Sequence, residues 1–250
     1  MNKKKVVALI PTRLNSLRLP AKALLPINKY PLIIHVYKRA MLAKRIDKVF
    51  ICCDHKKIFD VAKKYGANVI MTSKKHRNGT DRISEAYNKI RERFQLIVDI
   101  QGDEPLISPN HIDKVIEFHK KNMNYDIILP NLRIKSTINT NIVKLITNKK
   151  NEVIYISRAN LPFEFKSKIK TTKKHLSIIS FLPSSLSKYA SSQVSESEKI
   201  EDIELLRAIN IGLKIKTLNL TGDSFSIDVF KDYKKAQSQI TKDKVFKKYR

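Results

Sequence analysis

Charged side chains that could bind a polyphosphate follow the first predicted strand of this 250-residue chain. The apolar run 6–10 predicts a short buried strand, and Pro11 is expected to end it because proline cannot donate to a sheet ladder. The loop that follows carries Arg13, Arg18 and Lys22. Open α/β sheets bind ligands at the carboxyl ends of their strands, so this loop could seat a polyphosphate. A basic surface loop is an equally good interpretation of the same residues.

Two aspartates have the position and chemistry expected of Mg²⁺ ligands. Asp103 directly follows the clearest predicted central strand, residues 96–100, and Asp228 precedes the last predicted helix. Mg²⁺ takes few protein oxygens and completes its coordination shell with water and phosphate, so a carboxylate at either position could hold it. Taken alone, Asp103 also fits a turn or helix-cap aspartate, and Asp228 also fits a helix N-cap.

A loop rich in polar residues precedes a helix that is predicted to run to about Arg93. Thr80 can cap this helix, and the loop before it exposes backbone N–H groups that could face an anion. Three of the five glycines, Gly79, Gly102 and Gly222, lie in the loops that hold the candidate chemistry. A chain with so few glycines is expected to place them where the backbone turns tightly or approaches a ligand.

Strands and helices alternate along the chain, which is typical of an α/β fold with a mostly parallel sheet. Further strands are predicted at residues 49–53, 68–71, 125–133, 142–146, 152–156, 175–181 and 215–218. Helices are predicted at residues 31–44, 56–65, 109–122, 184–193, 198–210 and 229–240. Gly66 and Gly212 are placed to end helices, and the basic segment 242–250 is expected to fray. His175 opens a predicted strand, where a structural histidine is the commoner interpretation.

Composition narrows the class of protein. With 42% hydrophobic residues the chain can bury a core. No run approaches the roughly 20 apolar residues that span a bilayer, so we expect no membrane insertion and a cytoplasmic protein. Cys52 and Cys53 are neighbours within one apolar run, which indicates core thiols and excludes a disulfide framework or a zinc site.

The chain is strongly basic, with 50 Lys and Arg against 23 Asp and Glu and a formal net charge of +27. Such a charge attracts polyanions, which include nucleic acid, nucleotides and anionic lipid. The lysines are spread along the whole chain, however, and no helix-turn-helix, zinc finger or aromatic RNA-binding signature is present. A bias towards lysine explains the charge at least as well as binding does, so we do not expect nucleic acid to be the main partner.

Five motifs occur in the order and spacing of one enzyme family, and the chain resembles the 3-deoxy-manno-octulosonate (KDO) cytidylyltransferases, or CMP-KDO synthetases, over nearly its whole length. The motifs are Ile10-Pro11-Thr12-Arg13 to Lys22, Asn78-Gly79-Thr80-Asp81-Arg82, Gln101-Gly102-Asp103-Glu104-Pro105, Ser157-Arg158-Ala159 with Pro162, and Ile227-Asp228. The resemblance implies a Rossmann-like nucleotidyltransferase (nucleotide-diphospho-sugar transferase) fold with a smaller dimerisation subdomain. It implies one domain, 1–250, with a CTP-binding half at about 1–122, an acceptor-binding and dimerisation half at about 123–240, and a basic tail at 242–250.

The same resemblance implies a reaction and a role for each motif. CTP and a 3-deoxy-sugar acid would give a CMP-sugar and pyrophosphate with Mg²⁺, in a homodimer that serves lipopolysaccharide or surface polysaccharide synthesis. In-line attack on the α-phosphorus would depend mainly on positioning and charge neutralisation. The implied residues are Lys22, Asp103 and Asp228 for catalysis; Arg13 and Lys22 for the triphosphate; Gly79, Thr80 and Arg82 for cytosine and ribose; Asp103 and Asp228 for Mg²⁺; and Gln101, Arg158, His175 and Glu204 for the sugar acid. Arg158 suits the carboxylate of the sugar because a guanidinium fits a carboxylate with two parallel hydrogen bonds.

The chain departs from the family pattern mainly on the acceptor side. Ile179 stands where the family has a tyrosine, Leu205 replaces a glutamine, and Phe163-Glu164 replaces Trp-Asp. Ala21 stands where glycine is usual. Lost hydroxyl and amide groups can change specificity strongly, because unmatched buried polar groups are costly. The alternatives are therefore an 8-amino form of KDO or a nonulosonate as acceptor and, more distantly, a non-catalytic basic nucleic-acid-binding protein.

Overall fold

The computed structural model describes residues 5–16, 18–222 and 224–250. The chain divides into two compact units, and each is described by itself. Unit 1 comprises Met1–Lys114 with Ser224–Arg250, and unit 2 comprises Val115–Asp223. Unit 1 is therefore built from two separate pieces of the chain, with unit 2 inserted between them. Within the described residues, no helix has the length and apolar character needed to cross a membrane.

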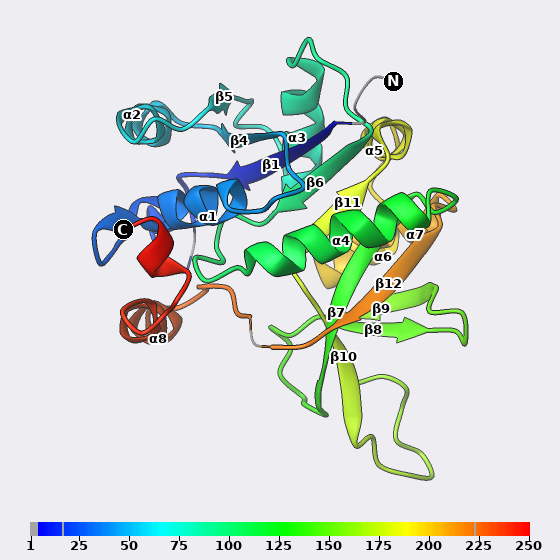
Figure 1. The fold of residues 1–250 in the computed structure, drawn as a ribbon. Coiled ribbons are helices and arrows are strands. Elements are labelled where there is room, and N and C mark those ends of the chain that lie inside the picture. Colours follow the sequence, from blue (N-terminus) through cyan, green and yellow to red (C-terminus); the bar gives the residue numbers. More distant parts are fainter. Residues whose placement is uncertain (1–4, 17, 223) are drawn as a thin grey trace. The chain divides into compact units, whose positions relative to one another are not determined.

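Unit 1 contains a parallel sheet in the strand order β5-β4-β1-β6 (Figure 1). Its strands are β1 (Val6–Thr12), β4 (Lys48–Cys53), β5 (Val69–Met71) and β6 (Leu96–Ile100). Its crossing helices are α1 (Leu32–Met41), α2 (Lys56–Lys64) and α3 (Gly79–Asn88). Every residue of β1 and β6 is buried, as expected for parallel strands with both faces covered. The prediction of an α/β fold with a parallel central sheet is confirmed.

The strand order of unit 1 reverses direction at β1. From β1 the chain crosses to β4 and then to β5 on one side, and it returns through α3 to β6 on the other side. Because such crossovers are right-handed, α1 and α2 cover one face of the strands and α3 covers the other. Ligands of open α/β sheets bind beyond the carboxyl ends of the two strands that flank this reversal, here β1 and β6.

Three local predictions in unit 1 are wrong. Pro11 does not end the first strand: β1 continues to Thr12 and pairs Pro11 with Cys52 of β4. The ladder to β6 has already ended at Leu9, so the missing N–H group of the proline removes no bond there. Asn78, not Thr80, caps α3, because the asparagine side chain accepts a hydrogen bond from the Asp81 N–H (2.8 Å). The helix also ends at Asn88 rather than near residue 93.

The remaining elements of unit 1 surround this sheet. They are the short 3₁₀ helix η1 (Lys22–Leu24), the hairpin of β2 (Pro26–Ile27) and β3 (Tyr30–Pro31), the first residues of α4 (Pro109–Lys121), α8 (Phe230–Ile240) and η2 (Phe246–Lys248). The chain end does not fray as predicted. Phe246 is buried, and the Tyr249 hydroxyl lies 2.9 Å from Nδ1 of His35 and accepts from Nε of Arg39 (3.2 Å). Aromatic packing at the end of the sequence thus outweighs the basic composition of the tail.

Unit 2 is organised around one long strand that pairs with three others. Its strands are β7 (Ile127–Lys135), β8 (Lys144–Thr147), β9 (Val153–Ser157), β10 (Thr171–His175), β11 (Ile178–Phe181) and β12 (Ile215–Leu220). β7 pairs with β12 in parallel and with β10 and β11 antiparallel, while β8 pairs with β10 and β9. The helices are the remainder of α4 and α5 (Pro183–Ala190), α6 (Glu196–Glu201) and α7 (Leu205–Asn210).

Two predicted elements of unit 2 are broken in the structure. The strand expected at residues 175–181 is the end of β10 followed by β11, so His175 closes a strand instead of opening one. The helix expected at residues 198–210 is two helices, α6 and α7, separated at Asp202, whose φ of 51° lies in the left-handed region. The apolar spacing that predicted one continuous helix is misleading here, because Ile200 of α6 is 75% exposed whereas Leu205 and Leu206 of α7 are buried.

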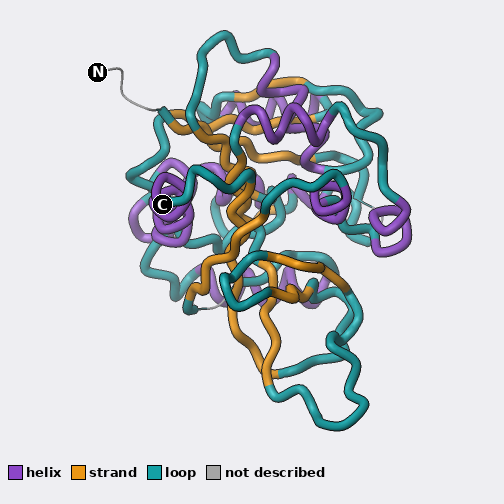
Figure 2. The backbone as a smooth tube through the Cα atoms, turned by 90° about the vertical axis from the view of Figure 1, so that its right-hand side faces the viewer, coloured by secondary structure: helices purple, strands orange, loops and turns teal. Residues whose placement is uncertain are grey.

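Unit 2 also carries an extended connection. The segment between β9 and β10 leaves the strands as a long loop, which Figure 2 shows in teal beside the strands in orange. Phe163 and Phe165 of this loop are 81% and 83% exposed.

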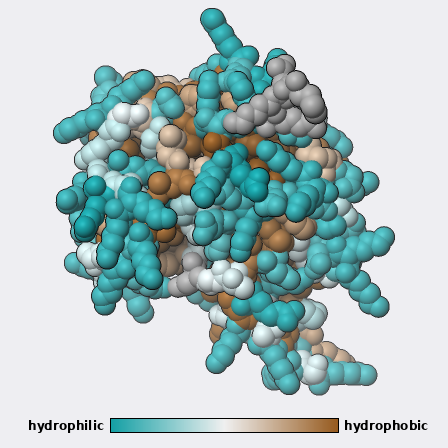
Figure 3. All heavy atoms as spheres, in the orientation of Figure 1, coloured by the Kyte–Doolittle hydropathy of each residue, from teal (hydrophilic) through white to brown (hydrophobic). Residues whose placement is uncertain are grey.

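On the face shown in Figure 3, hydrophilic side chains cover most of the surface, as the high content of charged residues predicts.

Candidate functional site

Four charged side chains of unit 1 form an ion-pair cluster, here called the Lys22 cluster. The ammonium of Lys22 lies 2.9 Å from Oδ2 of Asp103 and 3.6 Å from Oδ1 of Asp228. Nη2 of Arg18 donates to the same Asp228 oxygen at 2.9 Å. The structure therefore brings together the three residues predicted for catalysis, beyond the carboxyl ends of β1 and β6.

Backbone contacts explain how Asp228, far along the chain, reaches Asp103. Asp103 follows β6 in the tight segment that starts at Gln101, and its carbonyl oxygen accepts from the Ile227 N–H at 2.9 Å. One residue further, the buried carboxylate of Glu104 accepts a hydrogen bond from the Ser224 hydroxyl. These contacts tie the loop before α8 to the loop after β6, so the two aspartates are held on the same side of the unit.

The carboxylate of Asp228 does not cap α8. Val229 occupies the N-cap position, and Oδ2 of Asp232 accepts from the N–H groups of Asp228 and Val229, both at 3.1 Å. Asp232 thus satisfies the start of the helix, where a negative charge is favourable. The Asp228 side chain is left to face Arg18 and Lys22 instead.

The donor set of the Lys22 cluster fits Mg²⁺. Both carboxylates approach one cation within 4 Å, which is the arrangement that would let them share a divalent ion. In the described ranges no group of three or more His, Cys, Asp or Glu side chains could hold a metal, so a site made wholly of protein ligands is absent there. Mg²⁺ needs no such site, because it keeps several waters and binds substrate phosphates with one or two carboxylates.

The backbone is strained directly before Lys22. Ala21 has a φ of 50° and a ψ of 30°, in the left-handed region that glycine occupies without cost. The turn places Lys22 at the start of η1, facing Asp103. Ala21, which stands where the family pattern has glycine, therefore takes a backbone conformation that glycine would adopt without strain.

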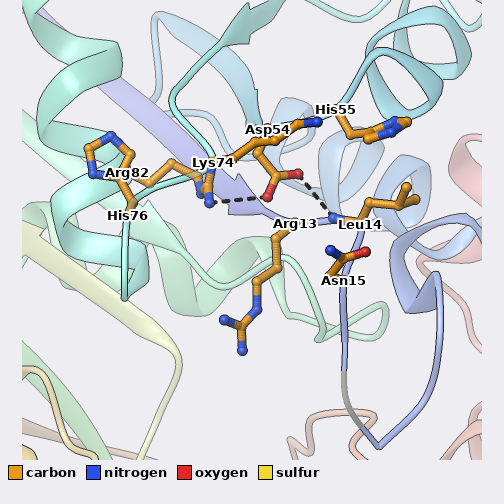
Figure 4. Close-up of a pocket in the computed structure, with 8 residues that line it drawn as sticks. All are labelled: Arg13, Leu14, Asn15, Asp54, His55, Lys74, His76 and Arg82. Carbon is orange, nitrogen blue, oxygen red and sulfur yellow. Dashed lines mark hydrogen bonds and ion pairs between the residues drawn. The ribbon is translucent and has the colours of Figure 1, made fainter.

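A pocket of about 150 Å³ lies beside the ends of β1 and β4 (Figure 4). Its lining residues are Arg13, Leu14, Asn15, Asp54, His55, Lys74, His76 and Arg82. Sequence reasoning named Arg13 and Arg82 as site residues and missed the others. Asp54 and His55 could have been found in the same way as Asp103, since they directly follow a buried strand that ends at this edge of the sheet.

Arg82 is 3% exposed, and protein atoms bind its guanidinium. Nη1 donates to the Thr72 hydroxyl (2.7 Å) and to the Ser73 carbonyl oxygen (3.1 Å). Nη2 lies 3.4 Å from Oδ2 of Asp54. Arg82 therefore lines the pocket while holding together the segments that follow β4 and β5. Thr80, predicted beside it, is fully buried within α3.

Two glycines allow close packing next to the ends of β1 and β6. A side chain at Gly102 would place its Cβ 2.6 Å from the Pro11 carbonyl oxygen, and a Cβ at Gly79 would lie 3.1 Å from the Pro11 ring. The Gln101 amide also packs here and donates from Nε2 to Oδ2 of the fully buried Asp99 at 3.0 Å. That bond directs the amide nitrogen of Gln101 towards Asp99. The side-chain carbonyl oxygen of Gln101 is then directed away from Asp99.

The other three residues predicted to bind the sugar, Arg158, His175 and Glu204, lie in unit 2. The Arg158 guanidinium donates to three backbone carbonyl oxygens, those of Glu201 (2.7 Å), Thr140 (3.0 Å) and Asp202 (3.1 Å). Three of its five N–H donors are thus in use, and at most two remain for a carboxylate.

The backbone of Arg158 also contacts charged side chains of unit 2, namely Glu201 and Lys144. Glu201 accepts from the Arg158 N–H at 2.8 Å and from the Ser157 hydroxyl at 2.6 Å. The fully buried Lys144 donates to the carbonyl oxygens of Asn139 and Arg158. These residues, together called the Arg158 cluster, join the ends of β8 and β9 to α6.

His175 and Glu204 occupy different elements of unit 2. Nδ1 of His175 donates to the Leu176 carbonyl oxygen (2.7 Å), and burial lowers the pKa of His175 to about 4, so the ring is neutral near pH 7. Glu204 precedes α7. Ile179 and Leu205, which replace polar residues of the family pattern, are 1% and 2% exposed.

The two cysteines behave as predicted from the sequence. Cys52 and Cys53 are both free and buried in β4. Burial raises the pKa of the Cys53 thiol to about 11 and that of Cys52 further, so neither forms a thiolate near pH 7. They contribute to the core of unit 1 and not to the chemistry of the site.

Comparisons with known proteins agree with this geometry. A model of the cytidylyltransferase family matches residues 7–215. The chain is 37% identical over 246 residues to a 3-deoxy-manno-octulosonate cytidylyltransferase of Thermodesulfovibrio yellowstonii, covering 92% of this chain and 96% of the relative. It is 33% identical over 248 residues to an 8-amino-3,8-dideoxy-manno-octulosonate cytidylyltransferase of Shewanella oneidensis, covering 95% and 99%.

Solved structures extend the comparison to the fold. The structure of a CMP:2-keto-3-deoxy-manno-octonic acid synthetase complexed with CTP superposes with a TM-score of 0.88 and 27% identity, covering 95% of this chain and 99% of that one. A cytidylyltransferase of Leptospira borgpetersenii, 20% identical, shares the fold with a TM-score of 0.65, covering 96% and 87%. The predicted nucleotidyltransferase fold is confirmed, and the chain belongs to the cytidylyltransferase family, among whose members its KDO cytidylyltransferase relatives match it almost end to end.

Proposed function

We propose that this protein transfers CMP from CTP to KDO and releases pyrophosphate. The observation that carries the proposal is the Lys22 cluster, in which one ammonium and two carboxylates meet beyond the carboxyl ends of β1 and β6. This is the position where α/β sheets bind ligands, and the charges suit a triphosphate with a divalent ion. The relatives named for KDO, at 36% and 37% identity, support the choice of acceptor.

The nucleotide would be held by cationic and small residues of unit 1. Arg13 and Lys22 would bind the triphosphate, and the pocket lined by Arg13 and Arg82 would take the cytosine and ribose. Gly79 and Thr80, in the first turn of the helix that carries Arg82, are the other residues proposed for this part of CTP. Bound phosphate oxygens would compete with Asp103 for the Lys22 ammonium. Fixed cations of this kind lower the barrier by holding the phosphates in line for attack and by balancing charge as it moves to the leaving pyrophosphate.

Asp103 and Asp228 would hold Mg²⁺ in this scheme. When bound, the ion neutralises charge on the phosphate oxygens and helps to orient the attacking sugar oxygen. The chain's own contribution is to keep both carboxylates on one side of the unit through the Ile227–Asp103 and Ser224–Glu104 hydrogen bonds. Arg18, paired with Asp228, would keep that carboxylate in place before the substrates arrive.

The sugar acid would be recognised by Gln101 of unit 1 and by Arg158, His175 and Glu204 of unit 2. Gln101 offers its carbonyl oxygen as an acceptor for a hydroxyl group, because its amide nitrogen already donates to Asp99. The 33% identity to enzymes named for 8-amino-3,8-dideoxy-manno-octulosonate makes that sugar the second candidate acceptor. A nonulosonate is the third, favoured only by the apolar replacements at Ile179 and Leu205.

Three further features belong to the proposal. The product would serve lipopolysaccharide or surface polysaccharide synthesis, and the enzyme would work in the cytoplasm, where CTP is available. It would act as a homodimer, with residues of about 1–122 as the CTP-binding half and residues of about 123–240 as the acceptor-binding and dimerisation half. Analytical ultracentrifugation of the purified protein tests the dimer directly: a single species at the monomer mass across micromolar concentrations would refute it.

The direct test of the reaction is pyrophosphate release by the purified protein with CTP, Mg²⁺ and each candidate acceptor in turn. We expect a rate with KDO that is lost when Mg²⁺ is chelated and is weak when UTP or ATP replaces CTP. A higher kcat/KM with the 8-amino sugar would reassign the acceptor. No release with any sugar acid, together with salt-dependent retardation of nucleic acid in a gel, would favour the nucleic-acid-binding alternative instead.

A further inference from the structure

Asp54 connects two parts of the pocket that come from different segments of unit 1. It directly follows β4 and is 9% exposed. Its Oδ1 accepts from the Leu14 N–H at 3.0 Å, and its Oδ2 faces Nη2 of Arg82 at 3.4 Å. Figure 4 shows the carboxylate between these two partners, with a dashed contact to each. One side chain thus contacts both the loop after β1 and the helix α3.

The contact to Leu14 fixes the residue that follows Arg13. The backbone of the loop after β1 has left the sheet at this point, since β1 ends at Thr12. A hydrogen bond from a loop N–H to a carboxylate is stronger than one to a neutral acceptor, so it restricts the loop effectively. In Figure 4 the Arg13 side chain extends away from Asp54 and its guanidinium lies at the far end. Anchoring Leu14 therefore limits the positions that this guanidinium can reach.

The contact to Arg82 fixes the opposite wall of the pocket. Arg82 is nearly fully buried and holds Thr72 and Ser73 through Nη1. A buried guanidinium without a countercharge is strongly disfavoured, and Asp54 is the carboxylate that faces it across the pocket lining. The pair keeps Arg82 pointing at the segment after β4, which sets the distance between the two walls.

From this geometry we infer that Asp54 is a positioning residue for the nucleotide: it couples the loop that carries Arg13 to Arg82, and so preforms the pocket before CTP binds. This inference rests on the proposed function of the pocket. Asp54 touches no reacting atom in this role. Its effect is exerted on the binding of CTP, through the loop and through the arginine, and it leaves the chemical step and the sugar acid to other residues.

The test is the Asp54→Asn variant with Asp60→Asn as the matched control. Asparagine keeps the size of the side chain and one acceptor oxygen but removes the charge that Arg82 requires. Asp60 lies on the exposed face of α2 in the same unit, paired only with Lys56 among the contacts of its side chain that the structure gives. We expect KM for CTP to rise about tenfold in Asp54→Asn, with kcat within about threefold and KM for the sugar acid unchanged.

This split of the kinetic constants separates positioning from a purely structural role. A variant that only folded less well would lose kcat in proportion to its inactive fraction and would keep the KM for CTP. Thermal melting of both variants reports folding independently. An unchanged KM for CTP in a folded Asp54→Asn protein would overturn the inference, as would a rise of the same size in Asp60→Asn.

A double variant keeps the test decisive if Asp54→Asn folds poorly. Asp54→Asn combined with Arg82→Gln removes both buried charges, so no uncompensated guanidinium remains. If Asp54 acts through Arg82, the double variant raises KM for CTP no more than Arg82→Gln does alone. A KM for CTP clearly higher in the double variant than in Arg82→Gln would show that the two residues act independently and would contradict the coupling.

Calorimetric titration with CTP, in the absence of any sugar acid, distinguishes failure of this inference from failure of the proposed function. Wild-type protein that binds no CTP would refute the proposed function itself. Wild-type protein that binds CTP, with an equally tight Asp54→Asn variant, would leave the function standing and remove the role of Asp54.

Discussion

The Lys22 cluster of unit 1 and the Arg158 cluster of unit 2 contain similar charges arranged in opposite ways. In the Lys22 cluster, side chain pairs with side chain, and Lys22, Asp103 and Asp228 keep between 16% and 26% of their side-chain surface exposed. In the Arg158 cluster, guanidinium and ammonium groups donate to backbone carbonyls. A ligand can replace an accessible ion pair with little change to the fold, whereas replacing bonds to the backbone disturbs the elements that they join.

This difference leads to a distinction between residues of the same type. Charged side chains that form accessible ion pairs with one another at the carboxyl ends of strands, as Lys22 and Asp103 do, are arranged for exchange with a substrate. Charged side chains that donate their hydrogen bonds to backbone carbonyl groups mainly maintain the structure. Arg158, predicted from the family motif to bind the sugar carboxylate, has features of the second kind, and its role in binding stays a prediction. Substitutions in the two clusters should therefore differ in whether activity or stability changes.

The largest effect is expected at Asp103. Asp103→Asn removes a charge that both Lys22 and a divalent ion would use, so kcat/KM should fall on the order of 10³-fold. The melting temperature should change little, because the carboxylate is partly exposed and water can solvate the ammonium of its partner Lys22. Pyrophosphate release and thermal melting, with Asp60→Asn as control, check both statements. Retention of most of the activity would show that the Lys22 cluster is only structural.

A smaller effect, on stability, is expected in the Arg158 cluster. Glu201→Gln leaves the Ser157 hydroxyl or the Arg158 N–H with a poorer acceptor near the buried Lys144. The free energy of unfolding should decrease by about 1–3 kcal/mol. The KM for the sugar acid should stay the same if the cluster is structural. A raised KM without loss of stability would instead place Arg158 in the acceptor site, as the resemblance implied.

The ion pairs beside the pocket of unit 1 should respond to pH at the acidic end. Desolvation acts to raise the pKa of Glu85, but hydrogen bonds from Lys89, the Ser73 N–H and His76 outweigh it and lower the pKa to about 2. The unfolded chain then binds a proton at higher pH than the folded one. The stabilisation is fully present above the unfolded pKa of about 4.5 and is lost as pH falls towards 2.

Glu85→Gln measures this contribution. The difference in melting temperature between wild type and variant should be constant above about pH 5 and should shrink steadily between pH 4.5 and pH 2.5. Melting curves over that range suffice. The control is Glu117→Gln, because Glu117 forms an ion pair with Lys121 on an exposed face of α4. The melting temperature of this variant should differ little from that of the wild type at any pH. A difference that grows on acidification would reverse the sign and refute the assignment.

The smallest effect concerns the strained turn before Lys22. Ala21→Gly relieves the left-handed conformation at the cost of chain entropy, and the net stabilisation should be about 0.5–1 kcal/mol. Ala190→Gly, at an exposed position in α5, should destabilise by a similar amount. Equilibrium unfolding in urea measures both changes. A destabilised Ala21→Gly would show that the alanine methyl group contributes contacts that outweigh the strain.

Sequence patterns predicted the central part of unit 1 well because several independent signals coincide there. The apolar run of β6 is followed at once by Gln101 and Asp103, so the strand, its end and the acidic side chain could all be located together. Gly66 was correctly expected to end α2, and its φ of 70° shows why. The pairing of Asp103 with Asp228 followed from family spacing and not from periodicity.

Other features depend on contacts that no local pattern encodes. The break at Asp202 and the turn at Ala21 place ordinary residues at positive φ, which tertiary contacts must impose. The tail was expected to fray because its lysines are visible in the sequence, whereas the hydrogen bonds of Tyr249 to α1 are not. The position of Asp54 after a buried strand is visible in the sequence, as that of Asp103 is, but its contacts with Leu14 and Arg82 are not.

The insertion of unit 2 into unit 1 has a consequence for the synthesis of the protein. Asp103 belongs to the first piece of unit 1, whereas Asp228, α8 and the segment that packs on α1 belong to its second piece, which is translated after unit 2. A nascent chain that has emerged as far as unit 2 therefore has the full parallel sheet and only one of the two carboxylates. The second carboxylate can join the first only after all of unit 2 has been translated, so chains terminated within unit 2 are made without a complete Lys22 cluster.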